Sequence, residues 1–226
     1  MKYLLALAAA GAVFSGASWA ARPLVSETAD SLGKHDCEWE TAVTSARVSG
    51  AGSARVFDTL VACGVGAHTQ VSGGYTRESV DGEQNQYAAL TGKTNLVEPK
   101  DGQTGWGLAY SASFDKASGA NWRHSGTRLL GVATRELGKG LTGHANLGWS
   151  RDVSAKANAT VWSLGLEGES PVRWTADVFG DDHSKPWVSA GLLWMLGEKF
   201  NVNVAVAQGT ESPRTRLWTL ACKLDF

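Results

Sequence analysis

The chain has 226 residues, a formal net charge of −1, and 27 glycines and 10 tryptophans against 5 prolines. A near-neutral chain without basic clusters argues against a nucleic-acid partner. The three cysteines show no spacing typical of a zinc or redox motif, so we expect neither a metal nor a cofactor.

Residues 1–20 have the features of a secretory signal peptide. Lys2 gives a positive start, an apolar run ends at Phe14, and small residues precede a cleavage site after Ala20. The alternative, an N-terminal membrane anchor, is disfavoured because the apolar run is well short of the ~20 residues that span a bilayer. The sequence therefore predicts an exported protein, and the absence of a cysteine at the cleavage site argues against a lipoprotein.

The mature chain begins with a polar, irregular stretch, residues 21–36, which is too short to be a folded plug. It either tucks into a lumen or is loose. No long uncharged apolar run follows, so no transmembrane helix is expected. The choice is between a soluble exported β protein and a closed membrane barrel.

From residue 37 onward, strand-like segments of about ten residues are separated by turn residues. The alternation is clearest at 105–114, where Trp106 and Phe114 share an apolar face opposite small residues. It is poor at 84–93, and the facing of 124–136 is ambiguous. The Gly92-Lys93 pair is similar to a phosphate loop but lacks the upstream glycine, the strand and the helix. The expected strands are 37–48, 54–65, 69–79, 84–93, 105–114, 124–136, 141–150, 157–167, 172–179, 187–196, 201–208 and 216–226.

The last segment, 216–226, alternates strictly and ends on Phe226. Such a segment resembles the closing strand of bacterial outer-membrane barrels, whose terminal phenylalanine is read by the barrel-assembly machinery. An even strand number lets both chain ends lie in the periplasm. We therefore predict an all-β fold: a closed antiparallel transmembrane β-barrel of about 12 strands (10 to 12) over residues 37–226, in outer-membrane lipid.

If the strands alternate in direction, aromatic residues collect near both membrane interfaces, as expected of a barrel and not of a soluble sandwich. Trp162 falls in mid-strand and does not fit. The expected girdle residues are Trp39, Phe57, Trp106, Phe114, Trp149, Trp174, Trp194, Trp218 and Phe226.

Polar residues on the opposite faces should line the lumen. Their charges are of mixed sign, which is compatible with a narrow hydrated channel and equally with closing salt bridges. The candidates are Glu38, Glu40, Asp58, Glu78, His144, Asn146, Arg173, Asp177 and Lys223.

All three cysteines are expected at the periplasmic end, on adjacent strands. Cys37 and Cys63 lie nearly opposite each other in the first hairpin and can form a disulfide, whereas free cysteines packed as small hydrophobes are the equal alternative. Cys222, on the closing strand, is expected near Cys37 and competes with Cys63 for it.

Several motifs resemble the meta-pathway phenol-degradation family of outer-membrane barrels: 135–149, 177–181 and 186–192, with similar runs at 22–25 and 37–40. These motifs consist of strands and turns and carry no chemistry. The resemblance implies a channel for small, often aromatic compounds.

Enzymatic alternatives have weaker support. Asp181-Asp182-His183 is similar to part of the omptin protease site, but the second acidic pair that would hold water is missing, so a solvated turn is favoured. A phospholipase-like site needs His and Ser two residues apart on a strand, whereas His124 and His183 each directly precede a serine.

We therefore expect a passive outer-membrane channel for a small-molecule solute, possessing no catalytic residues. A barrel with a packed lumen and a structural or assembly role is the main alternative.

Overall fold

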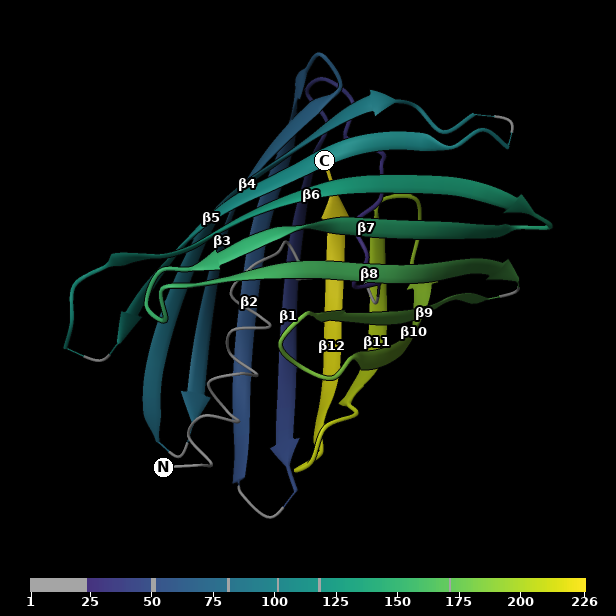
Figure 1. The fold of residues 1–226 in the computed structure, drawn as a ribbon. Helices are drawn as coiled ribbons and strands as arrows, with labels where there is room; N and C mark the ends of the chain where they lie inside the picture. Colours follow the sequence, from purple (N-terminus) through teal and green to yellow (C-terminus); the bar gives the residue numbers. More distant parts are fainter. Residues whose placement is uncertain (1–23, 50–51, 81, 101, 118, 171) are drawn as a thin grey trace.

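The computed structural model describes residues 24–226 except 50–51, 81, 101, 118 and 171; the predicted signal peptide, residues 1–20, lies outside them. Twelve antiparallel strands form one closed barrel, which confirms the predicted fold (Figure 1). The strands are β1 Cys37–Val48, β2 Gly52–Gly66, β3 Thr69–Val80, β4 Glu83–Val97, β5 Gly105–Ala117, β6 Arg123–Gly138, β7 Leu141–Asp152, β8 Ala157–Ser170, β9 Val172–Asp181, β10 Trp187–Met195, β11 Phe200–Gly209 and β12 Thr215–Asp225. No helix in the described part of the chain is long and apolar enough to cross a membrane.

The barrel closes where the first strand meets the last. β1 pairs with β12 from Glu38 opposite Asp225 to Val48 opposite Thr215. Beyond this ladder, Cys37 and Phe226 exchange two backbone hydrogen bonds of 2.9 Å each. The start of β1 and the end of β12 therefore lie together at one end of the barrel, which we call the terminus end.

Each strand turns one face outward and one face inward, because successive side chains point to opposite sides of a sheet. β1 shows this most regularly: Trp39 and Val43 are exposed, while Glu38, Glu40 and Thr44 are buried. Here the exposed face is apolar and the buried face is polar or small, the reverse of a soluble sandwich. This is the pattern of a barrel whose outside meets lipid.

The predicted girdle residues lie on the outward faces. Eight of them are exposed among the large hydrophobic side chains, and Phe114 is half-buried. Trp218 on β12 and Phe226, which directly follows β12, are each 59% exposed.

Short connections join the strands at both ends of the barrel. At the terminus end, Ala67 and His68 form a two-residue turn with φ of 49° and 54°, the left-handed values that a type I′ hairpin requires. The longest connections are 98–104 at this end and 118–122, 182–186 and 210–214 at the other. None of these connections exceeds seven residues.

Two strands with weak sequence patterns contain or face irregularities. The β4–β5 register shifts between Asn95 and Val97, and the β5–β6 register shifts between Ser113 and Phe114. A bulge inserts an extra residue and interrupts the alternation of faces. In β4 the interruption lies in the residues beyond the expected end of the strand, which reaches Val97. The facing of β6 was ambiguous in the sequence because Leu129 is exposed whereas Leu130 and Val132 are buried, so both faces carry apolar side chains.

Candidate functional site

The lumen contains the chain's own N-terminal segment, residues 24–36, the thin purple trace of Figure 1. The segment forms no strand of the barrel, yet Leu24, Ser26, Thr28 and Ala29 are buried. Ala29 is 0% exposed, so the barrel wall surrounds it completely.

Polar wall side chains hold the segment by its backbone. Asp177 on β9 accepts hydrogen bonds from the backbone N–H groups of Val25 (3.1 Å) and Ser26 (3.0 Å), and from the Ser26 hydroxyl (2.8 Å). Asn146 on β7 accepts from the Glu27 N–H (2.7 Å) and donates to the Glu27 carbonyl (2.9 Å). These contacts satisfy backbone groups that would otherwise be buried without partners.

The same kind of contact continues along the segment. The Thr134 hydroxyl on β6 accepts a hydrogen bond from the Ala29 N–H (2.8 Å), and the side-chain oxygen Oε1 of Gln70 on β3 accepts one from the Leu32 N–H (3.0 Å). The segment therefore crosses the lumen from β9 to β3. At its end, the His35 N–H donates to the Gly64 carbonyl at 3.0 Å, next to the start of β1.

Two inward glycines make room for the segment, and a third lies in ordinary contact with it. A Cβ at Gly64 would lie 1.9 Å from the carbonyl oxygen of Gly33, and a Cβ at Gly165 would lie 2.8 Å from the Ser26 hydroxyl. At Gly107, the nearest segment atoms would be 3.7 Å away, in Ala29. The wall is thus shaped around a bound chain.

Apolar contacts between segment and wall are small and local. Ala29 packs with Ala109, Leu130 and Val132, and Leu32 packs against a second cluster that includes Leu60. Because little apolar area is buried, hydrogen bonds and charge carry much of the specificity of this contact.

The segment's Glu27 meets two cations of the wall. Lys93 Nζ on β4 lies 3.7 Å from the Glu27 carboxylate and 3.5 Å from the Thr28 hydroxyl. Arg128 on β6 interacts electrostatically with Glu27, and its Nε is buried without a hydrogen-bond partner in the described part of the chain. Glu27, Lys93 and Arg128 line one small cavity of about 30 Å³.

A larger cavity of about 360 Å³ lies beside the segment. It is bordered by Leu24 and Thr28 of the segment and by Glu136, Glu167 and Lys223 of the wall. The lumen is therefore only partly filled, and polar groups dominate the boundary of the open space.

The structure places all nine predicted lumen residues on inward-facing positions, in separate groups. Asn146 and Asp177 contact the segment directly, and His144 lies 3.0 Å from the Thr134 hydroxyl that also binds it. Glu38 pairs with Lys223 (2.9 Å) across the β1–β12 seam, and Glu40 is buried nearby on β1.

Of the other three, Asp58 and Glu78 are bound by wall side chains, and Arg173 borders the larger cavity beside the segment. Asp58 accepts from the Thr76 hydroxyl (2.5 Å), and Glu78 accepts from the Tyr87 hydroxyl (2.9 Å). Arg173 is exposed at the terminus end and pairs with Glu169 at 2.6 Å.

Three important residues were not among the predicted ones. Lys93 and Arg128 sit on the two strands of weak alternation, so their facing was not readable from the sequence. Glu27 belongs to the segment whose position was left open. The lone basic residue within each of two otherwise neutral stretches, 87–95 and 125–133, was the available signal.

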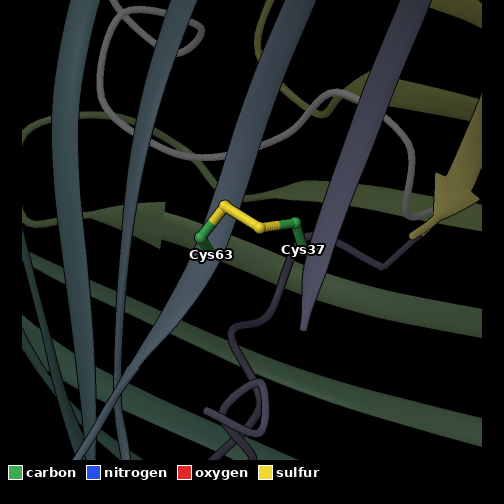
Figure 2. Close-up of a disulfide and its surroundings, with 2 residues drawn as sticks. All are labelled: Cys37 and Cys63. Atoms are coloured by element: carbon green, nitrogen blue, oxygen red, sulfur yellow. A yellow bond between two sulfur atoms is a disulfide. The ribbon is translucent and has the colours of Figure 1, made fainter. Parts of the chain in front are cut away.

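A disulfide joins the start of β1 to β2. Cys37 and Cys63 are register partners with Cα atoms 4.2 Å apart, and Figure 2 shows the sulfur–sulfur bond between the two strands. The expectation that Cys222 lies near Cys37 was wrong. Cys222 pairs with Thr41, four residues along β1, because Cys37 faces the chain end at Phe226; it is a free thiol.

The loop Asp181-Asp182-His183 forms a hydrogen-bonded turn. One carboxylate oxygen of Asp181 accepts from the backbone N–H groups of His183 (2.7 Å) and Ser184 (2.8 Å). The His183 imidazole donates to the Asn158 carbonyl (2.8 Å), and this bond, aided by the charge of Asp182, raises the pKa of His183. The hydrogen bonds of Asp181 and His183 hold the loop in its conformation, and this structural role explains their arrangement.

The model of a protein family described as Uncharacterised conserved protein UCP029691 matches residues 9–226. No curated protein matches the chain. The earlier resemblance to phenol-degradation barrels thus holds at the level of an outer-membrane barrel, and the matching family is a different one.

Solved structures of outer-membrane barrels share the fold. A KdgM porin in complex with disordered oligogalacturonate has a TM-score of 0.61 at 7% identity, covering 83% of this chain and 99% of that one. The outer-membrane phospholipase A of Escherichia coli gives 0.54 at 11%, covering 85% and 94%. The toluene transporter TbuX of Ralstonia pickettii gives 0.51 at 10%, covering 94% and 96%. At these identities the likeness shows the fold alone.

Proposed function

The chain belongs to the UCP029691 family, and we propose that it is an outer-membrane channel for small polar solutes whose lumen is closed by its own N-terminal segment. The observation that carries this proposal is the path of residues 24–36, held inside the barrel by side chains of β9, β7, β6 and β3. Export by residues 1–20 and assembly through the closing strand are part of the same proposal.

The way in which the lumen is filled favours a channel over a structural barrel. A structural barrel can fill its interior with its own large side chains. Here inward positions such as Gly64, Gly107 and Gly165 are small, and a separate segment occupies the space they leave. Once the segment is displaced, the wall encloses an open polar path.

The segment is built to leave and return. Its wall contacts are mainly individual hydrogen bonds and one ion pair, whereas its C-terminal end continues into β1, next to the Cys37–Cys63 disulfide. A segment fixed at one end remains at high local concentration and can rebind after release.

The lining favours polar solutes over the aromatic compounds that the sequence resemblance implied. Asp177, Asn146, Thr134 and Lys93 all present polar atoms to the lumen. Barrels of this fold include a KdgM porin described in complex with oligogalacturonate and a toluene transporter, so the fold itself does not decide between the two classes.

Solute flux into liposomes tests the proposal, with Glu27→Gln and Asp30→Asn as a matched pair. Both changes convert an acid to its amide, but Glu27 is paired with Lys93 whereas Asp30 is exposed. Removing one partner of a charge-assisted contact costs about 1.5–3 kcal/mol, which corresponds to roughly tenfold or more in the fraction of open barrels.

We expect faster uptake of a small sugar through Glu27→Gln, fastest uptake after deletion of residues 24–32, and the wild-type rate for Asp30→Asn. A folded barrel that passes no solute even after the deletion would contradict the channel and favour a structural role.

A further inference from the structure

Three strands of the wall converge on a single residue of the N-terminal segment, Glu27. Asn146 on β7 binds both the N–H and the carbonyl of its backbone, at 2.7 and 2.9 Å. Lys93 on β4 pairs with its carboxylate at 3.7 Å, and Arg128 on β6 adds a second positive charge. No other residue of the segment described here has both its backbone and its side-chain charge bound in this way.

These wall groups recognise chemistry that is not specific to a tethered chain. An asparagine amide is a paired donor and acceptor, so it matches any residue whose own N–H and carbonyl, which belong to two successive amides, point to one side. Lysine and arginine beside it match a carboxylate. The complete pattern is two successive amides that flank a carbon bearing a carboxylate on a short side chain.

Burial makes the charge requirement strong. Lys93 is only 5% exposed, and the Nε of Arg128 is buried without a hydrogen-bond partner in the described part of the chain. A lysine held away from water needs a counter-charge, and the half-buried Arg128 adds a second positive charge beside it. The wall carboxylates Asp177 and Glu78 are engaged elsewhere, with Ser26 and with Tyr87.

We propose that Asn146, Lys93 and Arg128 form a solute-binding site for acidic amides, such as acylated acidic amino acids or acidic peptides, and that Glu27 occupies this site as an internal ligand when the channel is closed. The inference rests on the proposed channel function, because a solute reaches the site only when the segment leaves it. The solute and the segment then compete, and the solute favours the open state by holding the site.

Calorimetry on the refolded barrel in detergent tests the site with two probes, N-acetyl-glutamic acid amide and N-acetyl-glutamine amide. The probes share the two backbone amides and differ only in the side-chain charge. They are titrated into the full chain carrying Glu27→Gln and into the barrel lacking residues 24–32, so the test does not depend on one variant folding.

We expect the acidic probe to bind at least about tenfold more tightly than the neutral probe. Lys93→Gln or Arg128→Gln, added to the Glu27→Gln chain, should remove this preference. Arg151→Gln, which changes an exposed arginine on β7 hydrogen-bonded to Asn158 at 3.2 Å, should leave it unchanged.

Equal affinity for the two probes, or a preference that survives Lys93→Gln and Arg128→Gln together, would overturn the site. Solute flux through the same variants is measured separately. Selective binding without flux would support the site and contradict the channel, whereas flux without selective binding would do the reverse.

Discussion

The glycines that face the lumen decide whether the N-terminal segment can lie against the wall. Gly64 is the strictest of them, because a Cβ there would lie 1.9 Å from the Gly33 carbonyl oxygen and 2.7 Å from that of Leu32. Both are backbone atoms that cannot rotate away. A side chain at position 64 must therefore push the end of the segment off β2.

Gly64→Ala should release the segment while the barrel stays folded. The measurement is cleavage by a glutamate-specific protease at Glu27, which is protected in the wild type by its contacts with Asn146 and Lys93. Gly131→Ala is the control, because its Cβ would make an ordinary 3.6 Å contact with the Leu147 carbonyl. Equal cleavage in Gly64→Ala and the wild type would show that the segment tolerates the side chain.

His183 provides a pH-dependent test of the loop after β9. Its imidazole donates to the Asn158 carbonyl, and Asp182 adds a negative charge; both raise the pKa of His183 above the ordinary value of about 6.5. Because the folded pKa is raised, the stabilisation of the loop is complete below about pH 6.5 and is lost as the pH rises through the higher folded pKa.

An NMR titration of the His183 imidazole should have its midpoint above about pH 6.5. Asp182→Asn should lower that midpoint only in part, since the Asn158 carbonyl remains. Glu211→Gln, in the connection before β12 at the same end of the barrel, should not move it. A midpoint at or below the ordinary value would contradict the hydrogen-bonded turn.

At the residue scale, the sequence revealed the lumen face but not its partners. Asn146 and Asp177 were predicted to face inward from the alternation of β7 and β9. Their actual role is to bind the backbone of residues 25–27, a contact made across more than a hundred residues of sequence. Periodicity reports which face a side chain occupies, and it contains no information about what fills the space in front of that face.

At the element scale, regular strands were readable and irregular ones were not. β1, Cys37–Val48, has the predicted limits because its exposed and buried residues alternate without interruption. β4 and β6 contain or face register shifts at Asn95 and Ser113. These shifts lie outside the stretches that carry Lys93 and Arg128. The facing of Arg128 was hidden because both faces of β6 carry apolar side chains, with Leu129 exposed and Leu130 and Val132 buried.

The Cys37–Cys63 disulfide joins the two strands of the first hairpin, next to the point where the N-terminal segment continues into β1. The Cys37→Ala, Cys63→Ala double variant should still form a barrel. Its free energy of unfolding should be lower by about 2–4 kcal/mol, so its unfolding midpoint should fall at a lower urea concentration. Cys222→Ala, which changes the free thiol on β12, is the control and should unfold near the wild-type midpoint. An unchanged midpoint in the double variant would mean that β1–β2 pairing alone holds the hairpin.

At the scale of the whole molecule, the closed barrel followed from features that add along the chain. Twelve alternating segments, aromatic residues toward their ends and a closing strand ending at Phe226 all pointed to one architecture, and each independent segment strengthened it. The position of residues 24–36 has no such redundancy. It depends on individual contacts with strands from β2 to β9, so only the three-dimensional arrangement reveals it.

Single-channel recording in planar bilayers tests the central claim most directly, with the wild-type barrel compared with the barrel lacking residues 24–32. We predict that the wild type is mostly closed with brief openings, and that the deletion variant conducts continuously, with at least about tenfold longer open time. The same conductance and open time in both proteins would contradict the claim that the N-terminal segment closes the lumen.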